Sequence, residues 1–166
     1  APHGVFPAAG EDRWIAIAVF SDEEWLRLCA ALGASALAAD ARFATLAGRL
    51  AHEDALDAAL GEQTRAHEAS ALMDRLQAAG VEAGVVQTCD DLLRDPQLAH
   101  RGHFVRLAHR HLGELACEHY GIRFSESPRR IETPAPDLGE HTQRVLGLVG
   151  YGEEEIRALA AAGVLA

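Results

Sequence analysis

A group of histidines near residues 100–119 is the first feature of the sequence that could do chemistry. Imidazole and thiolate are the usual ligands of zinc, and His109-x-His111 would place two rings on one side of a strand. Zinc sites usually show two tight ligand pairs at defined spacing, however, and arginines that would repel a cation lie among these residues. We therefore interpret the histidines as structural or exposed and expect no metal site. The group consists of His100, His103, His109, His111, His119 and Cys117.

Nucleophilic catalysis finds no support in the sequence. A catalytic nucleophile needs a base and a group that orients that base, but the chain has no G-x-S-x-G motif, no P-loop and no G-x-G-x-x-G. Cys89 is followed by Asp90 and Asp91, whose negative charges oppose formation of a thiolate. Most carboxylates lie where helices are expected to begin, where they complement the helix dipole. We therefore assign no catalytic residue to this chain.

The stretch 135–142 is the remaining candidate. Pro134 and Pro136 hold the approach extended, and Asp137 precedes a segment with helical spacing of apolar residues. A stiff arm that leads to a helix N-terminus could present backbone N–H groups to an anion.

Composition excludes several classes of partner. The 166 residues carry 15 basic and 25 acidic side chains, a formal charge of −10, and every basic residue is arginine. This acidic balance argues against nucleic acid and against an anionic membrane surface. The three cysteines are far apart, which indicates free thiols in a reducing cytoplasm, and no apolar run approaches the about 18 residues of a membrane span. The chain begins at Ala1 without Met, so either an initiator methionine was removed or the chain starts inside a longer protein.

The N-terminal half begins with strand and helix signals. Residues 1–10 contain prolines and glycines and are interpreted as a loop. The apolar run 14–20 is short and rich in β-branched residues, which indicates a buried strand. Ser21 and Glu24 form a capping box, and the helix that follows is expected to end at Gly33.

Helical patterns continue through the middle of the chain. Residues 40–60 are expected to be helical, with a break near Gly48 or His52, and Thr64 is expected to cap a helix that stops at Gly80.

A second strand follows over 81–86, and then a short helix over 90–93 that Asp95-Pro96 ends. The runs 104–107 and 115–120 predict a β-hairpin.

The C-terminal part is expected to be irregular over 125–136 and helical over about 139–149 and 153–162. The sequence thus predicts an α/β (α+β) fold: a small domain, residues 1–107, with a few-stranded sheet and helices, followed by residues 108–166 as hairpin, extended arm and two helices.

Several stretches in order resemble the C-terminal portion of class III CoA-transferases, the family of carnitine and formyl CoA-transferases and α-methylacyl-CoA racemases. GEHT followed by the terminal helix pair is the most specific of them. The stretches are APHGVFPAAGEDRWIAIAVFSDEEW (1–25), DARFATLAGR (40–49), LQAAGVEAGVVQ (76–87), LLRDPQLAHRGHFV (92–105) and APDLGEHTQRVLGLVGYGEEEIRALAAAGVL (135–165).

The resemblance implies the chain's place in a larger enzyme. In the family a large Rossmann-like N-terminal domain carries the catalytic aspartate and most contacts to CoA, and two chains interlock as a homodimer. This chain resembles the small domain and the segment that returns to the large one. It contains no match to the nucleophile, so the resemblance implies that the chain is inactive alone. CoA would be a substrate, and no cofactor is expected.

The resemblance also implies site residues. In several transferases a glycine-rich loop before the first strand covers the active site, and the corresponding place here is Pro2–Pro7, so His3 and Gly4 are expected near the substrate. The residues Gly139, Glu140, His141 and Thr142 are expected to be structural or adjacent to CoA.

Three functions remain open from the sequence. The first is a fragment of an acyl-CoA:carboxylate CoA-transferase that works through an aspartyl intermediate in the missing half. The second is a fragment of an α-methylacyl-CoA racemase, although Ser21 and Asp22 stand where some racemases place a glutamate. The third is a non-catalytic interaction domain. In either enzyme, apolar residues of the returning segment would need a partner surface, so we expect self-association or repacking. These residues are Leu138, Val145, Leu146 and Ile156.

Overall fold

The computed structural model describes residues 1–127 and 130–165, and the chain forms two compact units, one up to Asp90 and one from Asp91 onward. Helices combine with two small antiparallel sheets, so the expected α+β class is confirmed. The predicted boundary at residue 107 has another meaning than this division into compact units, because it separates a small domain from a segment expected to return to another domain. It stays a prediction.

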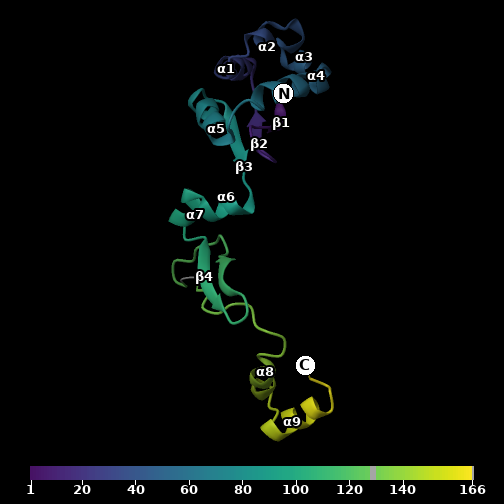
Figure 1. Cartoon of the computed structure of the whole chain (residues 1–166), viewed down its shortest axis with the longest axis vertical. Helices are drawn as coiled ribbons and strands as arrows, with labels where there is room; N and C mark the ends of the chain where they lie inside the picture. The colour runs from purple at the N-terminus through teal and green to yellow at the C-terminus, as the bar shows by residue number, and fades with distance from the viewer. Residues whose placement is uncertain (128–129, 166) are drawn as a thin grey trace. The chain divides into compact units, whose positions relative to one another are not determined.

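The first unit is built on a three-stranded antiparallel sheet in the order β1-β2-β3 (Figure 1). Its strands are β1 (His3–Pro7), β2 (Trp14–Ala18) and β3 (Glu82–Val86). Phe6 pairs with Ile15 across β1 and β2, and both side chains are buried with Ile17 on one face of the sheet. Because side chains alternate along a strand, the neighbours of these residues point to the opposite, open face.

The expectation of a loop over residues 1–10 is wrong, since residues 3–7 form strand β1. Proline and glycine suggested a loop, but Pro7 ends an edge strand, where a missing N–H costs no ladder bond. The turn that follows contains Asp12 at φ +49°, and the register returns Pro7 opposite Trp14. Strand β2 matches the predicted run but ends at Ala18, and Phe20 is exposed.

Helix α1 (Asp22–Leu32) confirms the predicted start and stop. The N–H of Glu24 donates to Ser21 Oγ at 3.1 Å, and Gly33 ends the helix at φ +70°. The carboxylate of Glu24 accepts from the N–H of Phe20, one residue before the N-cap, at 2.7 Å.

The predicted helical region 40–60 is divided into shorter pieces. Helix α2 (Ser35–Ala39) precedes it, followed by the 3-10 helix η1 (Ala41–Phe43), α3 (Leu46–Ala51) and α4 (Glu53–Thr64). The break between α3 and α4 falls at His52, as expected. Thr64 does not cap a new helix but is the last residue of α4, and its hydroxyl donates to a carbonyl of the same helix. Helix α5 (Ala69–Ala78) is capped instead by the carboxylate of Glu68.

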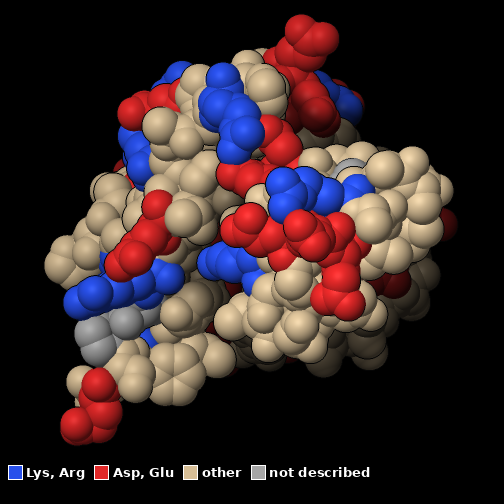
Figure 2. All heavy atoms as spheres, turned by 90° about the horizontal axis from the view of Figure 1, so that it is seen from below, with Lys and Arg blue, Asp and Glu red and all other residues tan. Residues whose placement is uncertain are grey.

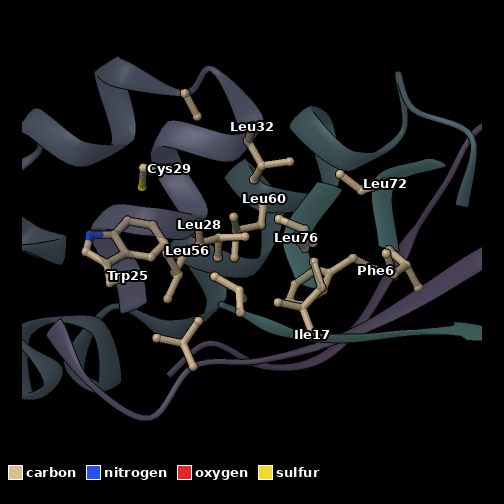
Figure 3. Packing of buried hydrophobic residues seen from close by; sticks show 14 of the residues in the cluster. Phe6, Ile17, Trp25, Leu28, Cys29, Leu32, Leu56, Leu60, Leu72 and Leu76 are labelled. Carbon is tan, nitrogen blue, oxygen red and sulfur yellow. The ribbon is translucent and has the colours of Figure 1, made fainter. Parts of the chain in front are cut away.

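The core of the first unit lies between the helices and one face of the sheet. Figure 3 shows side chains of α1, α4 and α5 gathered above Phe6 and Ile17 of the strands. Trp25 closes one end of this cluster, and its ring meets Phe43 edge-on with the centroids 6.2 Å apart. The labelled helix residues are Trp25, Leu28, Cys29, Leu32, Leu56, Leu60, Leu72 and Leu76.

The second unit follows helix α6 (Cys89–Arg94), which crosses the boundary between the units. Asp95 and Pro96 do end α6 but also begin α7 (Pro96–His100), a helix the sequence prediction missed. Asp95 is its N-cap and Pro96 its first residue, the position where proline is tolerated. The predicted hairpin is confirmed as β4 (Phe104–His109) and β5 (Gly113–Glu118).

Two helices close the chain, α8 (Thr142–Leu148) and α9 (Glu153–Ala161) (Figure 1). The predicted irregular stretch 125–136 has no helix or strand where it is described, and residues 128–129 of it lie outside the described residues. Within the described ranges, no helix is both long and apolar enough to cross a bilayer. On the face in Figure 2, arginine and acidic side chains are interspersed with uncharged surface.

Candidate functional site

His3 and Gly4, the residues predicted near the substrate, lie at the beginning of β1 and border a shallow depression over the sheet. The register places His3 opposite Ala18, and Ala18 opposite Glu82 of β3. The three strands thus bring an imidazole and a carboxylate to the same end of the open face. The depression has a volume of about 370 Å³ and is also lined by Val5, Ala16 and Gly84.

The floor of this depression is made of small side chains. Ala16, Ala18 and Gly84 carry at most a methyl group, so backbone is accessible from the open face of the sheet. Beside it, the ring of His3 meets exposed Phe20 edge-on, with centroids 6.0 Å apart. The arrangement offers an apolar surface with the imidazole of His3 and the carboxylate of Glu82 at one end.

Asp22, one of the two residues compared above with the racemase glutamate, has a partner in the structure. Its carboxylate accepts a hydrogen bond from Arg49 of α3 at 2.7 Å. Arg49 is buried, whereas Asp22 is half exposed. This ion pair accounts for Asp22 structurally, together with its place in the first turn of α1.

Arg49 is the residue that sequence reasoning missed. The signal in the sequence is its place at the end of the stretch DARFATLAGR, which resembles the family but does not indicate a role for the arginine. The structure explains this stretch: Asp40 caps η1, Thr45 caps α3, and Gly48 passes close to Arg42. A Cβ at Gly48 would lie 2.4 Å from the carbonyl oxygen of Arg42, so only glycine fits.

The second predicted group, Gly139 to Thr142, is gathered around a depression of about 390 Å³ in the second unit. Gly139 adopts φ +76° and turns the chain into α8, which glycine allows without strain. The apolar side of the depression is formed by Val145, Leu146 and Leu165.

An ion-pair network holds this stretch against the turn of the β4–β5 hairpin. Arg110 pairs with Asp137 at 3.0 Å and with Glu140, and His111 Nε2 lies 3.0 Å from the same Asp137 oxygen. The N–H of Asp137 donates to the Glu140 carboxylate at 2.8 Å. The hairpin turn therefore fixes the approach to α8.

The proposed anion site at this helix start loses its support. The helix begins at Thr142 rather than at about Gly139 and has only seven residues. The approach to it also carries the carboxylates of Asp137 and Glu140, which oppose an anion. Of the predicted site residues, His3 and Gly4 lie in the first unit, and Gly139 to Thr142 lie in the second.

The histidines of the second unit form no metal site among the described residues. His109 ends β4, while His111 lies in the turn, so the two are not on one strand as the spacing suggested. The Nδ1 atom of His109 accepts from the N–H groups of His111 and Leu112, at 3.2 and 3.3 Å, and so stabilises the turn.

The three cysteines are free thiols. Cys29 lies in the core, and burial raises the pKa of its thiol to about 11, which makes it unreactive at neutral pH.

Comparison with known proteins identifies the family. The model of CoA-transferase family III matches residues 1–142. The chain is 34% identical over 159 residues to a probable CoA-transferase of Mycobacterium tuberculosis, covering 95% of the chain and 20% of that protein. It is 30% identical over 166 residues to a succinyl-CoA–D-citramalate CoA-transferase of Chloroflexus aurantiacus, covering 99% of the chain and 41% of that protein.

The fold agrees with this match. A crystal structure of a CAIB/BAIF family protein from Brucella suis superimposes with a TM-score of 0.76 at 31% identity, over 90% of this chain and 38% of that one. The chain spans between a fifth and about two fifths of the length of these relatives. Sequence and fold agree along most of its length, and the chain belongs to CoA-transferase family III.

Proposed function

We propose that this chain is the small domain and returning segment of an acyl-CoA:carboxylate CoA-transferase. The complete enzyme would move CoA from an acyl-CoA to a free carboxylate through an aspartyl anhydride and an aspartyl-CoA thioester, with the aspartate on the part of the protein outside this chain. The observation that carries the proposal is that the chain matches CoA-transferases along most of its length but covers less than half of theirs.

The surface of the second unit supports a role inside a larger assembly. Leu138 is 92% exposed and Leu148 81% exposed, and Val145 is also exposed. Exposed apolar side chains that form one contiguous patch mark an interaction surface. Ile156, by contrast, was expected to lack a partner and is buried within its own unit, where α8 and α9 are in contact. We assign the exposed residues to contacts with a Rossmann-like N-terminal domain and with a second copy in a homodimer.

In the complete enzyme, the predicted site residues of each unit would have the roles that the family resemblance implies. His3 and Gly4 would lie near the acyl group, and Gly139 to Thr142 near CoA or in a structural role. We place the reaction in the cytoplasm, which the three free thiols support.

A chimera tests this proposal. The matched segment of the Chloroflexus D-citramalate transferase is replaced by this chain, and transfer of CoA from succinyl-CoA to D-citramalate is measured. We expect turnover by the chimera and none by the 166-residue chain alone. Turnover by the isolated chain would contradict the fragment assignment, and a folded but inactive chimera would favour a non-catalytic interaction domain.

The alternative of racemisation gains no support from the described residues at the place compared with the racemase glutamate. There, Asp22 accepts a hydrogen bond from Arg49, and Ser21 caps helix α1.

A further inference from the structure

The segment that enters β1 is held by two consecutive backbone carbonyls. The carbonyl of Ala1 accepts a hydrogen bond from Arg49 Nε at 2.6 Å, and the carbonyl of Pro2 accepts one from the N–H of Val19 at 2.9 Å. These bonds lie directly before His3, the first residue of β1. They therefore fix the direction in which the chain reaches the depression over the sheet.

Arg49 joins three separate segments through one guanidinium group. Besides Ala1, it donates from Nη1 to the carbonyl of Phe43 at 3.1 Å and from Nη2 to the carboxylate of Asp22 at 2.7 Å. Its Cζ lies 5.6 Å from the centroid of the Trp25 ring, within the range of a cation–π contact. The entry to β1, the end of η1 and the start of α1 thus share one donor group.

Stability alone is a poor explanation for this arginine. Its side chain is 1% exposed, and burying a guanidinium is costly unless its donors are used. Apolar side chains of similar volume often replace buried ion pairs without loss of stability. A planar guanidinium that donates to three acceptors differs from an apolar side chain, because it fixes the positions of those acceptors relative to one another.

We propose that Arg49 is a positioning residue that holds the entry of β1 and so places His3 and Gly4 over the sheet. The relevance of that placement to CoA transfer rests on the function proposed above. The positioning itself concerns only the first unit, where all the residues involved lie.

Amide hydrogen exchange on the full 166-residue chain separates positioning from stability. The N–H of Val19 reports whether Pro2 stays in place, and the N–H of Val81, bonded to the carbonyl of Leu76 at 3.0 Å, reports the rest of the unit. In Arg49→Met we expect exchange at Val19 to accelerate about tenfold or more, with a much smaller change at Val81.

Three further variants serve as controls. Leu72→Ala removes a buried side chain of α5 and should accelerate both amides in parallel, because it lowers global stability. Arg42→Met removes an exposed arginine of the same stretch, which pairs with Asp40, and should leave both amides unchanged. Arg49→Lys retains the charge but not the fork of donors, and should resemble Arg49→Met.

Parallel acceleration at Val19 and Val81 in both Arg49 variants would overturn the proposal, as would no acceleration at Val19. Failure of both variants to fold would also overturn it, because Arg49 would then be required for the whole unit. In the active chimera, Arg49→Lys should lower kcat/KM and Arg42→Lys should not. Since the exchange measurement uses no CoA, an inactive chimera would refute the proposed function without affecting this result.

Discussion

Arg49 donates a hydrogen bond to Asp22 at 2.7 Å from a side chain that is 1% exposed to one that is 51% exposed. Loss of the bond therefore has different consequences for the two side chains. Asp22 can be rehydrated when the bond is lost, whereas the guanidinium remains buried.

This asymmetry predicts different costs for two substitutions of Asp22. Asp22→Asn retains an acceptor oxygen for Arg49 and should lower the free energy of unfolding less than Asp22→Ala does. Asp22→Ala leaves a buried donor of Arg49 without its acceptor and should cost about 1–3 kcal/mol. Urea unfolding followed by tryptophan fluorescence measures both, and equal losses would contradict the asymmetry.

Two glycine-to-alanine substitutions should have opposite effects. At Gly48 the added Cβ would lie 2.4 Å from a backbone carbonyl oxygen, and we expect a loss of about 1–3 kcal/mol. At Gly61, in helix α4, the Cβ would meet the ring of Pro7 at an ordinary 3.6 Å. Alanine also favours a helix interior, so Gly61→Ala should be neutral or stabilising. Thermal melts of the two variants show whether each substitution raises or lowers Tm. An unchanged Tm for Gly48→Ala would show that the close approach of Gly48 to the Arg42 carbonyl is not required.

The cap of helix α5 predicts acid sensitivity. The N–H groups of Ser70 and Ala71 donate to the Glu68 carboxylate and hold its pKa below the usual value. Because the pKa is depressed in the folded state, the stabilisation is present above the unfolded value of 4.5 and is lost as the pH falls through the folded pKa. Glu68→Gln should therefore melt below the native chain at pH 7, and the difference should vanish in acid. A gap that persists unchanged at low pH would contradict the charge effect.

Asp57 predicts the opposite trend. Partial desolvation, and then the negative charges of Glu53 and Asp54, raise the pKa of its carboxyl above the usual value, although the residue is exposed. The ionised form is therefore unfavourable in the folded chain, and its cost disappears as the pH falls through the raised pKa. Asp57→Asn should raise Tm at pH 7 and have progressively less effect on acidification. An unchanged Tm at neutral pH would show that the ionised Asp57 carboxylate does not destabilise the folded chain.

The hairpin turn should restrain the approach to α8 in a salt-dependent way. Arg110→Ala removes both ion pairs to Asp137 and Glu140, and we expect faster exchange of the Glu140 N–H, which is bonded to the Asp137 carbonyl. Exposed ion pairs are individually weak and are screened by salt, so added NaCl should reduce the difference from the native chain. Arg106→Ala is the matched control, because Arg106 pairs with Glu114 within the hairpin. Equal acceleration in both variants would contradict a specific restraint.

Local signals in the sequence were sufficient for helix α1 and for the β4–β5 hairpin. Ser21, Glu24 and Gly33 each act through hydrogen bonds or dihedral preferences within a few residues, so their meaning does not depend on the rest of the chain. One error at a helix start also has a local origin: Thr64 is a residue type that caps helices, and its neighbours in sequence do not show that α4 is still continuing. The other differs, because Asp95 followed by Pro96 is a local signal for the start of α7 as well as for the end of α6.

The family and the α+β fold class could be predicted from the sequence, and both are confirmed. Only the tertiary structure showed that residues 3–7 form a strand and that Arg49 binds Ala1, Phe43 and Asp22. The physical reason is that two of the acceptors of Arg49 are backbone carbonyls. Every residue carries one, so no residue type marks which carbonyls the folded chain brings to the guanidinium.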